Sequence, residues 1–298
     1  MDVKALRTLA NTILYEGYLL YPYRPSALKN RSQGWTFGTL LPQPYAVSHP
    51  GESSEFQAEM LATGDQPSFT AELRFLHLTT ADAVERTAAI GPVAVRDLIS
   101  CPVHQDFGFP TAGDTCTGCS AILGTVRVSA EMVGDSVFKL RMTATNCSPS
   151  GACETRDDAL RQAFVSAHAV ATVAQGQFVS LLDPPADLRA PAASCKQQGV
   201  FPVFAGVAGD GSAMLSSPII LYDHPKVAAN SNGDFFDSTE IDEMLTLRVM
   251  TLTDAEKNEI RAASELGRAV LQRTESLTPK EILDLHGVAH KAGGKEGS

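Results

Sequence analysis

The sequence predicts an α+β fold, with an antiparallel, sandwich-like β region that holds one inserted helix and precedes a C-terminal helical segment. Three observations support this prediction. Segments with alternating apolar and polar residues dominate residues 35–222, one helix-capping signal interrupts them, and helix-start signals recur after residue 237. Because regular helices do not separate the strands, a doubly wound parallel sheet is disfavoured.

Four segments follow from this pattern. Residues 1–34 are predicted to form an N-terminal helical or extended segment, rich in aromatic and basic side chains. Residues 35–222 form the β domain, with the inserted helix near 156–167. Residues 223–291 form the C-terminal helical segment. Residues 292–298, which are mostly glycine and polar, form a flexible tail.

The clearest strand covers residues 69–78, where Phe69 and Phe75 share one face and Glu72 and Arg74 the other. This period of two is typical of a half-buried strand. Residues 121–133 and 137–144 alternate in the same way on either side of Gly134-Asp135, which predicts a hairpin. The remaining strands are predicted at residues 35–41, 56–62, 170–173, 178–182, 201–205 and 213–221.

The inserted helix is predicted from Thr155, an N-cap residue type followed by acidic residues in the first turn. Residues 186–194, rich in alanine and proline, are predicted to be a linker. Asp237 and Glu240 resemble a capping box that opens the C-terminal helices. Further helices are predicted to start at Thr253 and at Thr278, where proline follows at the first helical position.

The composition excludes several classes of function. The chain of 298 residues has a net charge of −10, so we do not expect a nucleic acid partner, because phosphate binding requires a basic face. We also expect no membrane insertion, because the sequence contains no run of 18 apolar residues. The apolar N-terminal stretch carries Glu16, which is not typical of a signal peptide, and a cytoplasmic location is expected.

Four of the six cysteines lie between residues 101 and 147, which favours metal binding over disulfides in a reducing compartment. Cys101 and His104 form one pair with two residues between them, and Cys116 and Cys119 form another. Three thiolates and one imidazole are a suitable ligand set for a tetrahedral, structural Zn²⁺. The alternative is that these are unrelated residues of a loop or buried thiols.

A second group of candidate residues contains histidine and carboxylates. Asp223 and His224 follow an apolar strand, Asp237 and Glu240 lie shortly after them, and His168 precedes another predicted strand. If the two strands are neighbours, the histidines and acids form a general base or a metal site. The alternative is that Asp237 and Glu240 cap a helix and His224 lies in a bend. Cys195, Ser166 and Ser217 are weaker candidates for a nucleophile.

The only concentrated basic segment of this acidic chain lies among aromatic residues near the N-terminus. We predict that it binds a protein partner through Tyr21, Tyr23, Arg24, Lys29, Arg31 and Trp35. The alternative is that these cations stack on the rings or pair with acidic residues downstream, as surface side chains commonly do.

Five segments of the chain together resemble an uncharacterised bacterial protein family that is associated with gene clusters for nickel–iron hydrogenases of the hydrogen-scavenging type. They are residues 13–31, 35–42, 159–170, 178–185 and 216–257. The resemblance extends over nearly the whole chain and implies an accessory protein in hydrogenase assembly or maturation, whose partner is a hydrogenase subunit or a maturation factor. It brings no catalytic residues with it, and residues 101–119 depart from the family pattern.

Three functional hypotheses follow. The first is a non-catalytic binding or assembly protein, which is favoured because GxGxxG, GxxxxGK[ST], HExxH and GxSxG are all absent from the sequence. The second is a metal-binding protein with Zn²⁺ at residues 101–119. The third is an enzyme that uses His224 with nearby carboxylates.

Overall fold

The computed structural model describes residues 38–78, 83–110, 121–149, 155–219 and 221–225. It also describes isolated residues at 6–7, 9–11, 13–14, 254, 257–258, 271–272 and 275–276. The chain divides into two compact units. The first contains Met1–Ala10 and Thr36–Pro225, and the second contains Asn11–Trp35 and Lys226–Ser298. The predicted domain boundaries remain predictions.

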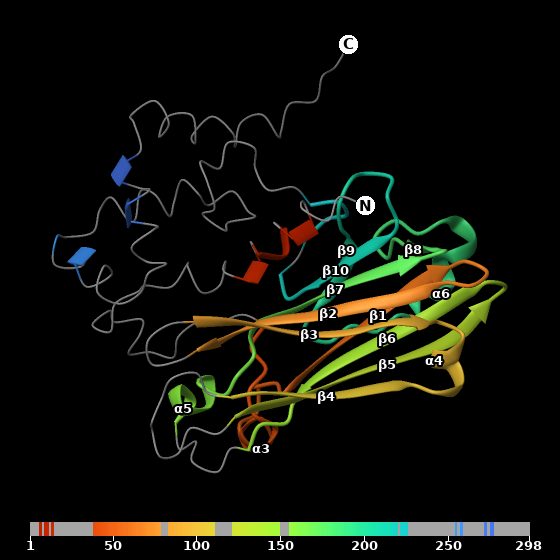
Figure 1. The fold of residues 1–298 in the computed structure, drawn as a ribbon. Helices are drawn as coiled ribbons and strands as arrows, with labels where there is room; N and C mark the ends of the chain where they lie inside the picture. Colours follow the sequence, from red (N-terminus) through yellow and green to blue (C-terminus); the bar gives the residue numbers. More distant parts are fainter. Residues whose placement is uncertain are drawn as a thin grey trace. The chain divides into compact units, whose positions relative to one another are not determined.

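The first unit contains two five-stranded sheets in which all neighbouring strands are antiparallel (Figure 1). The first sheet, in spatial order, contains β4 (Val103–Phe109), β5 (Ile122–Gly134), β6 (Val137–Asn146), β1 (Glu55–Thr63) and β8 (Gln177–Val179). The second contains β3 (Ala83–Ala94), β2 (Ser68–Leu78), β7 (Val165–Ala174), β10 (Ala213–Ser217) and β9 (Phe201–Phe204). The predicted sandwich-like α+β fold is therefore confirmed.

The core lies between the two sheets. One face of β2 contributes Phe69, Leu73 and Phe75, and β6 contributes Phe138 and other apolar residues to the same cluster. These side chains are fully buried. Burying a side chain of this size stabilises the fold by about 2 kcal/mol relative to leaving it exposed. Because the period-two pattern places these side chains on one face of each sheet, the two sheets pack with their apolar faces together.

The predicted hairpin is present as β5 and β6, which pair along almost their whole length. The turn between them contains Ser136 at φ 54°, a left-handed conformation that a tight turn of this kind requires. Two edge strands were not predicted. β3 is rich in alanine, which has low β propensity, and β4 contains His104, which was considered only as a possible zinc ligand.

The inserted helix is shorter than predicted. Helix α5 (Arg156–Leu160) begins with a capping box in which Thr155 and Asp158 exchange hydrogen bonds, so the predicted start is correct. It ends seven residues before the predicted end at 167, because β7 already begins at Val165 and pairs with β2. The tertiary pairing overrides the helical signal there.

Four other short helices in the described part of the chain were not predicted. They are α3 (Gln43–Ser48), α4 (Asp97–Ser100), η1 (Ala186–Leu188) and α6 (Arg189–Ala193). The last two lie in the predicted linker, which is therefore partly helical. Of the predicted strand 35–41, the described part contains only an isolated bridge from Leu40 to Phe164.

The second unit is described at few positions. The residues described between 254 and 276 are helical, which agrees with the helix predicted from Thr253. Lys257 and Glu275 form an ion pair with an Nζ–Oε1 distance of 3.7 Å. The predicted helix starts at 237 and 278 lie outside the described residues. No helix in the described part of the chain is long and apolar enough to cross a membrane.

Candidate functional site

The carboxylate of Asp223 joins the two sheets at one side of the sandwich. Its Oδ1 accepts a hydrogen bond from the backbone N–H of Phe204 at 2.8 Å, and its Oδ2 accepts one from the hydroxyl of Ser180. Phe204 ends β9, the edge strand of one sheet, and Ser180 directly follows β8, the edge strand of the other. We call this arrangement of Ser180, Phe204 and Asp223 the Asp223 clip.

The hydroxyl of Ser180 also fixes the loop that follows β8. Its oxygen accepts hydrogen bonds from the backbone N–H groups of Leu182 at 3.1 Å and Asp183 at 2.9 Å. The hydroxyl thus donates one hydrogen bond and accepts two, which exhausts its capacity. Bonds to an ionised carboxylate are stronger than those between neutral groups, so the clip is a firm connection.

His224 is also held by structural contacts. Its backbone N–H donates to the carbonyl of Phe204 at 2.9 Å, and its ring stacks on the Phe204 ring with centroids 5.2 Å apart. Its backbone has a φ of 55°, a left-handed conformation that histidine tolerates better than most residues. Nδ1 is buried and has no hydrogen-bond partner among the described residues. Asp237 and Glu240, the other candidate acids, lie outside the described part of the chain.

Three large apolar side chains are exposed on the segments that the clip holds. They are Leu182, Val207 and Tyr222, with exposed fractions of 50%, 58% and 62%. Leu182 donates its N–H to Ser180, Tyr222 precedes Asp223, and Val207 lies in the turn that follows β9.

His168 does not share a site with His224. The strand that carries His168 and the strand that precedes His224 are neighbours, as the prediction of a shared site required, because β7 pairs with β10. However, the residue after His168 pairs with Ser216, whereas His224 bonds to Phe204, which pairs with Met214. The two histidines therefore lie beside different ends of β10. In addition, β10 lies between β7, which carries His168, and β9, to which His224 bonds, and two strand spacings amount to about 10 Å.

His168 itself is completely buried, and its Nδ1 lies 2.8 Å from the carbonyl of Ser166. Since that carbonyl can only accept, Nδ1 carries the proton and Nε2 has no partner among the described residues. Burial, with a smaller contribution from the Arg74 guanidinium, lowers the pKa of His168 to about 4. The ring is thus neutral at physiological pH. Ser166 and Ser217, the weaker nucleophile candidates, are also fully buried.

The predicted zinc ligands are described only in part. Cys101 is an exposed thiol after α4, and His104 lies on β4, where its Nε2 is 3.6 Å from the Asp106 carboxylate. Cys116 and Cys119 lie outside the described residues, as do all the predicted partner-binding residues from Tyr21 to Trp35. In the described ranges no three potential metal ligands come together. The zinc site stays a prediction.

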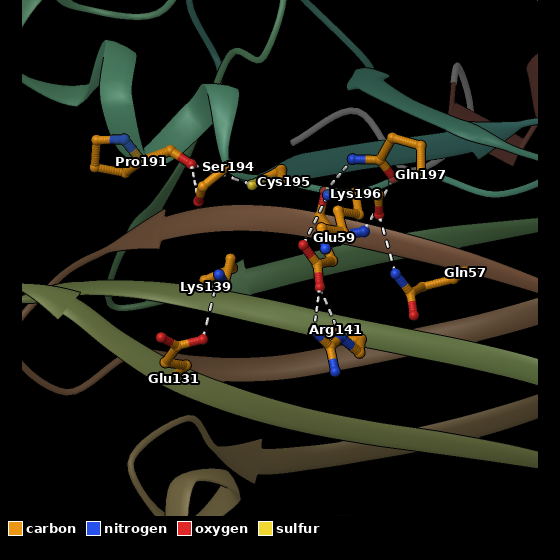
Figure 2. A network of polar contacts seen from close by, with 10 residues as sticks. All are labelled: Gln57, Glu59, Glu131, Lys139, Arg141, Pro191, Ser194, Cys195, Lys196 and Gln197. Carbon is orange, nitrogen blue, oxygen red and sulfur yellow. Dashed lines mark hydrogen bonds and ion pairs between the residues drawn. The ribbon is translucent and has the colours of Figure 1, made fainter.

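An ion pair between a buried carboxylate and a half-exposed arginine, which the sequence did not indicate, lies on the first sheet (Figure 2). The side chain of Glu59 on β1 is fully buried, and its Oε1 is 2.6 Å from both Nε and Nη2 of Arg141 on β6. Its Oε2 accepts the backbone N–H of Lys196 at 2.7 Å. Glu59 continues the alternation of polar residues Glu55 and Gln57 along β1, so no local pattern marked it as buried.

The neighbouring Gln197 completes the edge of β1. Its side-chain amide accepts from the N–H of Glu59 at 3.0 Å and donates to the carbonyl of Glu59 at 2.7 Å, as a neighbouring strand would (Figure 2). On one side of it Gln198 and Gln57 exchange backbone hydrogen bonds, and on the other β8 pairs with Leu61. The edge of β1 is therefore closed to other strands.

Cys195, a weak nucleophile candidate, lies beside this network. Burial raises the pKa of its thiol to about 11, and the Glu59 carboxylate adds to the effect while Lys139 opposes it. Its Sγ lies 3.6 Å from the carbonyl of Pro191. Because the thiolate is the reactive form, this thiol is a poor nucleophile at neutral pH.

The opposite side of the sandwich is joined by Arg86. This residue of β3 places its guanidinium 5.1 Å from the ring centroid of Phe109 on β4 and donates to the carbonyl of Pro110 at 3.3 Å. It also lies 3.5 Å from Nδ1 of His77. Burial and the Arg86 charge lower the pKa of His77, which favours the neutral ring. In that form Nδ1 can accept a hydrogen bond from the Arg86 guanidinium.

Comparison with known proteins adds no assignment. No model of a protein family and no curated protein matches the chain.

Proposed function

We propose that this protein is a non-catalytic accessory protein that binds a subunit or maturation factor of a nickel–iron hydrogenase during assembly in the cytoplasm. The Asp223 clip is the observation that carries the proposal. The residues that the sequence singled out for acid–base chemistry, Asp223 and His224, hold together two sheet edges, next to segments with exposed apolar side chains.

The surroundings of Asp223 support a positioning role over a catalytic one. A general base must reach the proton of its substrate directly or through one water molecule. Both oxygens of the Asp223 carboxylate already accept hydrogen bonds from the protein, and the His224 ring lies against Phe204. The large apolar side chains exposed to solvent on the segments around these groups are Leu182, Val207 and Tyr222.

The identity of the partner comes from the sequence resemblance. The segment 216–257, which carries much of that resemblance, contains Tyr222, Asp223 and His224. The segment 178–185, which contains Ser180 and Leu182, is another part of it. Both segments meet at the Asp223 clip, which supports a shared role of this region in the hydrogenase-associated family. The free thiols of Cys101, Cys147 and Cys195 suit a reducing compartment.

Affinity purification from cells that produce the hydrogenase tests this proposal. We expect the tagged chain to recover a hydrogenase subunit or maturation factor in a near-stoichiometric amount. Recovery of the chain alone would contradict the proposal. A His224→Asn variant separates binding from catalysis, because asparagine also tolerates a positive φ. Full hydrogenase activity in cells with this variant is expected, whereas an enzyme that uses His224 would lose its function.

A further inference from the structure

We propose that the outer edge of β4 pairs with β4 of a second copy of this chain. The two strands run antiparallel about a two-fold axis at Gln105, and the first sheets of the two copies then form one continuous sheet. The dimer is independent of the proposed function, because it needs no hydrogenase subunit.

The backbone of β4 has one unpaired edge. β4 is the last strand of the first sheet and pairs with β5 over its whole length in a constant register. Within the described chain its backbone forms hydrogen bonds to β5 alone. The N–H and C=O groups that point away from β5 are therefore a row of free donors and acceptors, which is a template for another strand.

The structure describes three other edge strands, and each of them is protected. β8 has only three residues. β9 contains Pro202, and its Phe204 N–H donates to Asp223. β3 contains Pro92, beside a shift in its register with β2. Short length, proline and bulges prevent sheet edges from associating. β4 has seven residues, contains neither proline nor lysine and has no register shift, so it is the edge among these four that is open to a partner.

The exposed side chains of β4 select a second copy in one register. Residues directly opposite one another lie on the same face of a sheet. With Gln105 opposite its own copy, His104 lies opposite Asp106 of the second copy, and this pair occurs twice. An imidazole can donate a hydrogen bond to a carboxylate. A two-fold axis at Asp106 would instead place that acidic side chain opposite itself, which is destabilising.

Both side chains of this pair are available to a second copy. Within one chain His104 Nε2 lies 3.6 Å from the Asp106 carboxylate, which is longer than a hydrogen bond, and the two side chains are 62% and 84% exposed.

The other face of β4 is apolar and fits the same register. Val103 and Phe107 are partly buried against the core, and Val103 lies opposite Phe107 of the second copy. Arg86 contacts Phe109 and Pro110, which lie outside the paired residues 103–107. A single pair of strands buries a small area, so we expect a weak and reversible dimer.

Sedimentation velocity of the purified full-length chain over a wide range of concentrations tests the inference, and we expect a monomer–dimer equilibrium. His104→Asp places an acidic side chain opposite Asp106 of the second copy and should weaken dimerisation about tenfold. The double variant His104→Asp with Asp106→Lys restores opposite charges in the same register and should regain the natural affinity. Thr87→Asp is the matched control, because Thr87 is exposed on the edge strand β3, and it should leave dimerisation unchanged. Circular dichroism establishes that the variants fold.

Gln105→Lys tests the position of the axis. It places two lysines opposite one another and should also weaken dimerisation about tenfold, since lysine commonly protects sheet edges. A monomer at every concentration would overturn the inference, as would a dimer whose affinity neither His104→Asp nor Gln105→Lys changes. A dimer that Thr87→Asp dissociates would place the interface at β3 and would also overturn it. None of these results affects the proposed hydrogenase binding, which affinity purification tests separately.

Discussion

Two carboxylates of the first unit, Glu59 and Asp223, hold backbone groups in place. Glu59 is fully buried against Arg141, whose own side chain is 50% exposed. Asp223 accepts from one backbone and one hydroxyl group. Because the Glu59 side chain is buried and the Arg141 side chain can reach water, loss of the arginine should destabilise the fold more than loss of the carboxylate charge.

Replacing Arg141 is therefore expected to cost more than replacing Glu59. Arg141→Ala leaves a buried carboxylate without its cation, which should lower the free energy of unfolding by about 3 kcal/mol. Glu59→Gln leaves an arginine that can still reach water, at a cost of about 1–2 kcal/mol. Urea denaturation measures both. The surface pair Lys139–Glu131 is the control, and Glu131→Gln should cost less than about 1 kcal/mol. Equal decreases in the free energy of unfolding for Arg141→Ala and Glu59→Gln would contradict this interpretation.

The buried His168 predicts how stability depends on pH. Its pKa is about 4 in the folded protein and about 6.5 in an unfolded chain. Between these values the unfolded state binds a proton that the folded state does not. Stability is therefore complete above pH 6.5 and decreases as pH falls towards 4, by about 3 kcal/mol.

Denaturation at several pH values compares the natural chain with His168→Asn. The variant should lose this part of the pH dependence, whatever its stability at pH 7. His49→Asn is the control, since His49 is exposed and stacks on Tyr45. An unchanged slope in the His168 variant would show that this ring is already protonated in the fold.

At the scale of elements, the edge of β1 is closed by three different partners in succession. β8 pairs with its end, the Gln197 side chain with its middle, and the Gln198 backbone with its start. A side chain can replace a strand here because its amide carries the same donor and acceptor as a peptide group.

Removing this side chain should open the edge locally. Gln197→Ala leaves the N–H and C=O of Glu59 without partners, which is expected to cost about 2 kcal/mol. Hydrogen exchange measured by NMR should show faster exchange of the Glu59 amide. The amides of Ala58 and Met60, which face β6 by strand alternation, should remain protected. Protection of Glu59 equal to that in the natural chain would contradict this account.

The sequence indicated those elements whose signal is local. The β5–β6 hairpin follows from alternation around Gly134-Asp135, and the start of α5 from Thr155. It did not indicate the end of α5, because the pairing of Val165 with Leu76 on another strand decides it. Nor could it indicate the role of Asp223, whose partners lie 19 and 43 residues away along the chain. A side chain with distant partners leaves no local pattern.

At the scale of the whole first unit, one polar side chain joins the two sheets on each side of the sandwich. Asp223 connects the ends of β8 and β9, and Arg86 connects β3 with β4. The apolar core packs the sheets face to face, and these two side chains join their edges, together with a backbone hydrogen bond from Phe178 on β8 to Gly211. The segments around Asp223 are those with the exposed side chains of Leu182, Val207 and Tyr222.

Loss of the clip should affect the stability of the unit as a whole. Asp223→Ala removes two charge-assisted hydrogen bonds and leaves the Phe204 N–H unpaired, so we expect a decrease of about 3 kcal/mol in the free energy of unfolding. Asp223→Asn, which keeps one acceptor, should cost about half as much. Thermal and urea denaturation measure this, with Asp135→Ala as a surface control. A change below about 0.5 kcal/mol in Asp223→Ala would show that the clip does not hold the edges.

Hydrogen–deuterium exchange of the protein with and without the purified hydrogenase subunit that it binds tests the central claim most directly. The account predicts that the partner slows exchange at residues 180–183, 204–210 and 221–224, which surround the Asp223 clip, and leaves exchange in β4 and β5 unchanged. Protection confined to β4 and β5, with none around the clip, would contradict it.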